Sequence, residues 1–409
     1  MASRSWSRGL VGAAFLLTAC DADVVLLEPE KADASDAVTL TVQVSDSNLA
    51  RRLGWSPGTG VPGATVRIRQ DERSDVQSFV TDDQGVLRLD DLPSALYWIW
   101  VEKQLDPGAA SAGAPPVLGG GRRTGLKRGD SVSVAVRGND RGSLVISEVY
   151  YHDPPFAVTG GDDAYDYHYY VELYNNSDTT IYLDGKIVGG AFSVAIDISS
   201  WPCTETATWR NDPRGVWAQS FQRFPGSGRE HALASGGVVV IAEQAIDHSA
   251  IYPGLPDLSH ADFQFSWQDR ALNPDVPTML PVALRTPTKR TMGIAFYVPF
   301  VADVPNLASL ERTFNLQLEF ALFPRESLLD IAQIALDTYQ LPRESRICGN
   351  SVEYSLDALM SFASPSRLHA DAHLLTARRR LLPDGVALQR TGVSAVDWEM
   401  APRSPGRVR

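Results

Sequence analysis

The chain has 409 residues, a formal net charge of −12 and an apolar content of 44%. The apolar content is sufficient for a folded core, and the length predicts two or three domains. An acidic chain repels phosphate backbones, so the composition argues against a nucleic-acid-binding protein.

The first twenty residues have the features of an export signal. Arg4 and Arg8 give a positive start, and residues 10–19 form an apolar run that is too short to span a bilayer. The run ends in Leu17-Thr18-Ala19-Cys20, which resembles the lipobox of bacterial lipoproteins, in which the cysteine thiol takes a diacylglycerol. We therefore predict a signal peptide over residues 1–19, lipidation of Cys20 and a tether over residues 20–36. The alternative is an ordinary secretory signal that ends at a cysteine by chance.

The cysteine content fits an exported chain. There are three cysteines, and lipidation of Cys20 leaves Cys203 and Cys348 as a pair. An oxidising envelope favours a disulfide between such a pair. Two unrelated thiols remain the alternative.

Residues 37–139 are expected to form a small β-sandwich domain. Alternating or β-branched runs predict strands at 39–45, 60–68, 78–82, 86–91, 96–103 and 131–137. Asp83-Gln84-Gly85 supplies a tight turn between two of these strands. Residues 106–129 are rich in Gly, Pro, Ala and Arg and predict a long, mobile loop. Residues 138–142 are the predicted linker to the next domain.

Three short motifs in this region resemble one known family. They read VPGATV from residue 61, TDDQG from residue 81, and Leu92-Pro93 followed by Tyr97. The order resembles carboxypeptidase-regulatory or prealbumin-like sandwiches, which are mostly spacers or attachment modules. The chain departs from that pattern at Ser94-Ala95-Leu96, where the family usually has a glycine before the tyrosine position.

Residues 142–409 are expected to form a second β domain with long irregular insertions. Its predicted strands lie at 144–151, 168–174, 180–183, 236–242, 291–301, 313–323 and 330–335, with a closing strand at 385–390. Residues 245–260 predict a short helical or irregular crossing, and residues 273–287 contain four prolines. Helices and strands do not alternate steadily, which argues against a parallel α/β sheet.

The start and the end of this second region resemble lamin-tail-type domains, which are immunoglobulin-like sandwiches. The matching residues at the start are Ile146, Glu148, Tyr170, Glu172, Asn175, Leu183 and Gly185, and those at the end lie in 387–390, 397–399 and 404–406. More closely, the whole of 142–409 is similar to an uncharacterised family of bacterial envelope lipoproteins, in which a long insertion separates the two ends. This resemblance implies a lipid-anchored protein of the outer membrane, on its periplasmic or its surface face. It also implies an accessory role in the uptake of glycans or peptides.

Few residues carry a pattern that is typical of catalysis or metal binding. Asp162, Asp163 and Asp166 form an oxygen-rich loop that is a weak candidate for calcium, and a solvated loop is the alternative. Glu148 and Glu172, on neighbouring predicted strands, could act together in glycoside hydrolysis, but they are also pattern residues of non-catalytic lamin-tail domains.

Three other patterns do not meet the requirements of the sites that they resemble. His369 and His373 lack the glutamate of a zincin. Gly58, Gly60 and Gly63 have a dinucleotide-binding spacing, but they precede a β-like run and Pro62 removes a backbone donor. The basic run 378–380 is interpreted as a solvated strand or turn face.

These observations favour a mainly β protein with two sandwich domains in series. The expected function is that of a non-catalytic envelope lipoprotein, a binding or scaffold module without a cofactor. Its expected partners are the membrane and an envelope protein complex or glycan. The alternatives are an adhesin-like surface stalk and a hydrolase.

Overall fold

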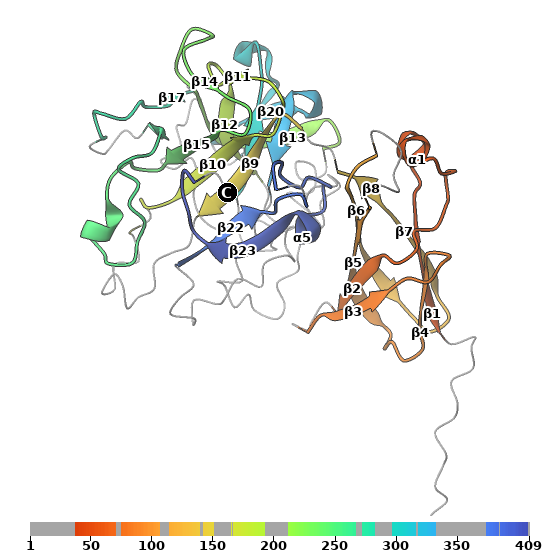
Figure 1. Cartoon of the computed structure of the whole chain (residues 1–409). Helices are drawn as coiled ribbons and strands as arrows, with labels where there is room; N and C mark the ends of the chain where they lie inside the picture. Colours follow the sequence, from red (N-terminus) through yellow and green to blue (C-terminus); the bar gives the residue numbers. More distant parts are fainter. Residues whose placement is uncertain are drawn as a thin grey trace, which may run out of the picture.

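The computed structural model describes residues 37–70, 75–106, 114–139, 142–150, 165, 167–192, 212–266, 272–282, 297–315, 318–332, 374–383 and 385–407. The described part of the chain is mainly β, which confirms the predicted fold class. Figure 1 shows two bodies, one built from strands β1 to β8 and one from the later strands. Within the described ranges, no helix combines the length and apolar character that a membrane crossing requires.

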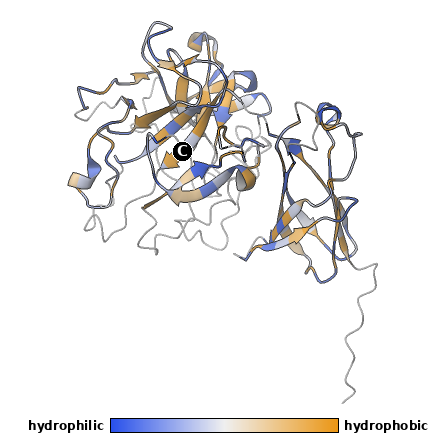
Figure 2. Cartoon of the chain, viewed as in Figure 1, coloured by the Kyte–Doolittle hydropathy of each residue, from blue (hydrophilic) through white to orange (hydrophobic). Residues whose placement is uncertain are grey.

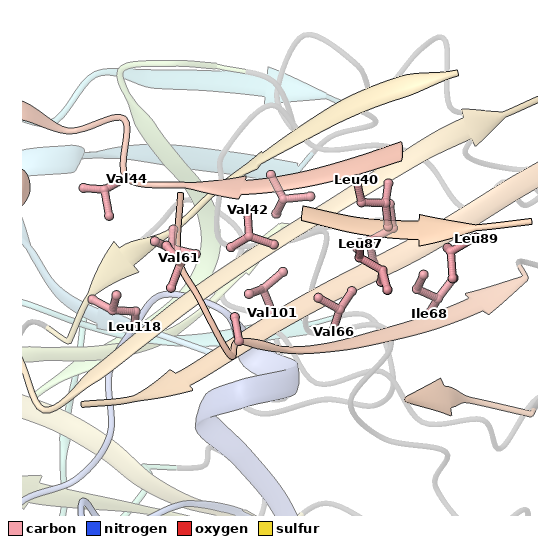
Figure 3. Packing of buried hydrophobic residues seen from close by; sticks show 14 of the residues in the cluster. Leu40, Val42, Val44, Val61, Val66, Ile68, Leu87, Leu89, Val101 and Leu118 are labelled. Atoms are coloured by element: carbon pink, nitrogen blue, oxygen red, sulfur yellow. The ribbon is translucent and has the colours of Figure 1, made fainter. Parts of the chain in front are cut away.

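The first domain consists of two facing sheets. A three-stranded sheet has the order β4 (Val86–Leu89), β1 (Val38–Gln43) and β7 (Ser131–Ala135), and a five-stranded sheet has the order β3 (Gln77–Val80), β2 (Thr65–Gln70), β5 (Ala95–Gln104), β6 (Val117–Leu126) and β8 (Arg137–Gly138). Leu40 and Val42 of β1 point toward Val66 and Val101 of the facing sheet (Figure 3), and all four are fully buried. The alternating sequence of these strands produces this single inner face.

A short helix, α1 (Ser47–Leu53), closes one end of this sandwich. It begins after Asp46, whose side chain accepts a hydrogen bond from the Leu49 amide at 2.6 Å. It ends at Gly54, which has a φ of 71°, a conformation that glycine adopts without strain.

The second domain contains a six-stranded and a seven-stranded sheet. The six-stranded sheet has the order β16 (Phe263–Gln264), β15 (Val238–Ala242), β10 (Tyr170–Asn175), β9 (Leu144–Tyr150), β22 (Leu375–Arg379) and β23 (Trp398–Pro402). The seven-stranded sheet has the order β19 (Arg312–Asn315), β20 (Leu318–Pro324), β13 (Gly215–Arg223), β12 (Ile187–Phe192), β18 (Tyr297–Ala302) and β21 (Leu328–Ile331), with β17 (Leu280–Pro281) paired to β13. A small ribbon joins β11 (Ile181–Tyr182) and β14 (Ala232–Leu233), and the short helices are η1 (His248–Ala250), η2 (Leu307–Ser309), η3 (Arg325–Ser327) and α5 (Ser394–Asp397).

The main core of the second domain lies between these two sheets. Ile146 and Leu173 contribute from the six-stranded sheet, and Val188 and Val301 from the seven-stranded sheet. Apolar residues dominate the central strands (Figure 2). The predicted alternation of β10 correctly identifies its core face, but every residue of β9 and β10 is buried, so the opposite face of this sheet is also covered.

The predicted loop at 106–129 is wrong for its second half, because β6 is a ten-residue strand that pairs with all of β5. Two of its glycines mark close packing rather than a loop. A Cβ atom on Gly119 would lie 2.4 Å from Oγ1 of Thr391, and one on Gly120 would lie 2.6 Å from the carbonyl oxygen of Ala135. Glycine in a strand interior often marks such a close approach, which composition alone does not distinguish from flexibility.

Two strand predictions in the second domain are also wrong. The single strand expected at 313–323 is the hairpin of β19 and β20, paired from Asn315 and Leu318 outward. The closing strand expected at 385–390 is absent from the described residues, in which this segment makes one isolated bridge between Leu381 and Leu388. The last strand is β23 instead, in which Trp398 and Met400 pack against the main core.

An apolar seam joins the two domains. Trp98 and Trp100 of β5, together with Val117, form a buried cluster with residues of the second domain: Leu382, Ala387, Val393 and Val396. Burial of a large apolar side chain contributes about 1.5–3 kcal/mol, so several such contacts hold the domains in one orientation. The backbone N–H of Arg390 also donates to Oδ1 of Asn139 across this seam.

Candidate functional site

A row of four charged side chains crosses the six-stranded sheet on the face opposite the main core. Glu172 on β10 is the register partner of Glu148 on β9, Glu148 is the partner of Arg378 on β22, and Arg378 is the partner of Glu399 on β23. Register partners project to the same face of a sheet. We call these four residues the charged row. The predicted neighbouring positions of Glu148 and Glu172 are thus confirmed.

Two carboxylates of the charged row, those of Glu148 and Glu172, bind residues near the C-terminus. Glu148 accepts from the Ser404 amide at 2.9 Å and from the Ser404 hydroxyl at 3.1 Å, and it also accepts from the Tyr170 hydroxyl. Glu172 accepts from the Gly406 amide at 2.8 Å and from the Ser147 hydroxyl at 2.7 Å. Residues 403–407, which we call the C-terminal strap, are therefore fixed across this face of the sheet.

Arg403 fixes the other end of the strap. Its guanidinium lies over the ring of Tyr150, 5.4 Å from the ring centroid, and donates to the Tyr150 hydroxyl at 3.2 Å. It also donates to the carbonyl oxygen of Gly254 in the crossing segment after β15. The strap thus ties together β9, β10 and a segment about 150 residues earlier in the chain.

Burial changes the acidity of this face. Burial and the nearby charge of Glu148 raise the pKa of Glu172 to about 7. Burial also raises the pKa of Glu148, although hydrogen bonds from Tyr170 and Ser404 oppose the change. Near neutral pH Glu172 therefore holds a proton more readily than an exposed glutamate does.

A pocket of about 300 Å³ adjoins the charged row. Apolar side chains form part of its wall, namely Tyr174, Val238, Leu381 and Leu388. Ser147 and charged residues form the rest, and besides the four members of the charged row the charged residues are Arg379, Arg380 and Arg407, the last of them on the strap. The pocket thus combines an apolar wall with an unusually large number of charged groups, which favours a polar or charged ligand.

The basic run 378–380 is not a solvated face, contrary to its interpretation from the sequence. The side chain of Arg379 is 3% exposed and donates to Asp330 at 2.7 Å and to the Ile146 carbonyl oxygen at 2.9 Å. It also lies over the ring of Trp398, 4.5 Å from the centroid. Alternation in β22 sends Arg378 to the outer face and Arg379 inward, where charged partners from distant parts of the chain surround it.

Several predicted site residues lie outside the described residues. They are the lipidation candidate Cys20, the disulfide candidates Cys203 and Cys348, the calcium candidates Asp162, Asp163 and Asp166, and the rejected pair His369 and His373. Their predicted roles remain predictions. The glycines at 58, 60 and 63 precede strand β2 rather than a helix, as expected from their context.

Several aromatic residues of the second domain are buried and have structural roles. Tyr169, Tyr170 and Trp217 are all buried. Tyr165 is also buried, and its hydroxyl lies 2.6 Å from Nδ1 of His248. Burial lowers the pKa of His248 to about 4, so its ring is neutral near pH 7.

One cluster of possible metal ligands was not found from the sequence. Side-chain ligand atoms of Asp184, Glu230 and His231 lie within 4.8 Å of one another. The Asp184 carboxylate already accepts from the backbone amides of Glu230 and His231, both at 2.9 Å, and Glu230 accepts from Ser227. These bonds close a turn between β13 and β14, which accounts for the acidic side chains without an ion.

Comparison with known proteins gives similarities of low identity. No protein family and no curated protein matches the sequence. The chain is similar to the solved structure of a DUF4876 family protein from Bacteroides thetaiotaomicron, with 15% identity and a TM-score of 0.47 over 91% of this chain and 98% of that one. It is also similar to a DUF3823 family protein from Bacteroides uniformis, with 10% identity and a TM-score of 0.18 over 50% of this chain and 82% of that one. Neither similarity bears on function, which has to be inferred from the residues of this chain.

Proposed function

We propose that the chain is a non-catalytic lipoprotein of the cell envelope that acts as a binding or scaffold module, accessory to outer-membrane uptake of glycans or peptides. The proposal that the chain is not an enzyme is supported by the hydrogen bonds that Glu148 and Glu172 already accept. Both carboxylates accept hydrogen bonds from the backbone of the C-terminal strap. Their chemistry is used to hold the fold together.

A glycoside hydrolase would need these carboxylates in a different state. One carboxylic acid must reach the glycosidic oxygen, and the other must face the sugar carbon or a water molecule. Here Ser404 and Gly406 already donate to oxygens of Glu148 and Glu172, so neither carboxylate is free to take the part of acid or nucleophile without losing a bond to the strap. The geometry therefore favours a structural role for the pair.

The seam between the domains supports a scaffold role. Trp98 and Trp100 are both buried against the second domain, and Arg380 lies 3.9 Å from Glu102 across the seam. A tethered protein with a fixed angle between its domains presents its far surface in one orientation. This suits a component that positions a ligand or a partner close to a membrane.

Replacement of Cys20 by serine is expected to abolish membrane anchoring, because the acyl chains need the thiol and several chains are needed for stable attachment. Fractionation of cells expressing either chain, with washes in high salt and carbonate, measures the effect. The wild-type chain should stay with the membranes, and Cys20→Ser should not. Retention of the variant after both washes would show that the anchor is not a lipid on Cys20.

The binding function is tested by co-purification of the full chain from membranes with its partners. The same envelope partner is expected with the wild-type chain and with a folded variant that carries both Glu148→Gln and Glu172→Gln. The purified chain is also assayed with polysaccharide, peptide and ester substrates. Turnover that the double variant loses while its thermal unfolding stays cooperative would establish a hydrolase instead.

A further inference from the structure

We infer that the pocket beside the charged row binds a small organic acid, and that Arg380 and Arg407 receive its carboxylate group. The inference rests on the proposed binding function and names its ligand class. The pocket volume of about 300 Å³ is at the lower end of the range for small-molecule sites and suits one sugar unit or a dipeptide.

The arginines of the pocket differ in how far they are already neutralised. Arg378 is held by Glu399, with nitrogen–oxygen distances of 2.5 and 3.1 Å. The buried Nε of Arg380 has no hydrogen-bond partner among the described residues, and the carboxylates of Glu102 and Glu399 lie 3.9 and 4.0 Å from the Arg380 guanidinium, too far for hydrogen bonds. Arg407 is exposed, and no described residue forms an ion pair with its side chain.

A carboxylate satisfies these two arginines better than other anions do. A guanidinium offers parallel N–H donors that match the two oxygens of a carboxylate. A polyanion is disfavoured because the whole chain carries a net charge of −12. The ligand is therefore expected to carry one acidic group.

The remaining wall of the pocket specifies the body of the ligand. Tyr174, Val238 and Leu388 offer apolar contact, while Ser147 and Glu172 at the inner end offer hydrogen-bonding atoms. This combination suits a sugar ring with hydroxyl groups or a short peptide with amide groups. A uronic acid and an acylated dipeptide thus share the required chemistry.

Titration calorimetry on the full chain in detergent distinguishes these two sources. Galacturonate is compared with neutral galactose, and N-acetyl-dialanine with its C-terminal amide. At least one acid is expected to bind about tenfold or more tightly than its neutral partner, because hydrogen bonds to a charged group are stronger than neutral ones. The combined Arg380→Gln and Arg407→Gln variant should lower the affinity for that acid by about 10- to 100-fold and leave the neutral partner unchanged.

The matched control is Arg223→Gln. Arg223 is exposed on β13 of the seven-stranded sheet, so its replacement removes a positive charge away from the pocket. It should leave the affinity for the acid unchanged. Should the double variant fail to fold, Arg407→Gln alone serves as the test, since this exposed side chain makes no ion pair within the described chain.

Three results would overturn the inference. They are the absence of binding of either acid at about 10 mM, equal affinity for the acids and their neutral partners, and unchanged acid affinity in the arginine variants. The proposed function fails separately. An envelope partner that co-purifies with the arginine variants would preserve the binding or scaffold function while the acid-binding pocket is excluded.

Discussion

Replacement of Asp330 by alanine is expected to lower the free energy of unfolding by about 3–5 kcal/mol, because it leaves a buried arginine without its main partner. Asp330 lies on β21 of the seven-stranded sheet and is 4% exposed. Its Oδ2 accepts from the Ile146 amide at 2.9 Å and from Arg379 at 2.7 Å, and its Oδ1 accepts from Arg390 at 3.1 Å. One carboxylate thus links both sheets and the segment before α5.

The loss is expected to be this large because, among the described residues, no unoccupied carboxylate lies close enough to Arg379 to take the place of Asp330. The nearest remaining acid to Arg379 is Asp397, whose carboxylate oxygen lies 3.8 Å away. Asp397 already accepts from the backbone and the hydroxyl of Thr391 at 2.9 Å. Breaking the Asp330 contacts would leave Arg379 charged, buried and poorly paired.

Urea denaturation measures the change, with Asp303→Ala as the matched control. Asp303 pairs with Lys186 at 2.5 Å, but its side chain is 52% exposed. Pairs that water reaches contribute about 0–1 kcal/mol, so the control should unfold close to the wild-type midpoint. If both variants lose the same small amount, the buried network is not a major source of stability.

Local patterns in the sequence predicted the faces of strands better than their limits. Val171 and Leu173 face the core as their alternation indicates, because a side-chain period of two is a local property. The same period places Arg379 on the opposite face from Arg378 and Arg380, but it does not indicate that the face of Arg379 is the buried one. The partners of Arg379 are 49 and 18 residues away, and such distant pairs leave no local signal.

Only the two glutamates of the candidate site could be predicted from the sequence, and their partners could not. Glu148 and Glu172 could be placed on neighbouring strands, because two β-like runs flank a polar break. Their partners Ser404 and Gly406 follow 256 and 234 residues later. A serine and a glycine in a closing turn have no feature that indicates which carboxylates they contact. The pocket depends on the same long-range closure, since Arg407 belongs to the strap.

Ionisation of Glu172 is expected to lower the free energy of unfolding as the pH rises from about 4.5 to about 7, and Glu172→Gln should remove this contribution while leaving that of His248, which acts in the opposite sense, unchanged. The pKa of Glu172 is about 7 in the folded chain and 4.5 as its ordinary value. At Glu172 the folded chain therefore binds more protons than the unfolded chain within this window, so this residue makes the free energy of unfolding decrease with rising pH. One unit of pKa corresponds to about 1.4 kcal/mol, so Glu172 accounts for a decrease of about 3 kcal/mol.

Glutamine resembles the protonated form of Glu172, because its oxygen can accept from Gly406 and its amide can donate to the Ser147 hydroxyl. Urea denaturation at several pH values between about 4 and 8 compares Glu172→Gln with the wild type. As the pH rises across this range, the free energy of unfolding of the variant should increase by about 3 kcal/mol relative to that of the wild type. Glu326→Gln, at an exposed position, is the control and should run parallel to the wild type. If the curve of Glu172→Gln also runs parallel to that of the wild type, folding does not raise the pKa of Glu172. The strap would then bind a carboxylate that burial has not destabilised.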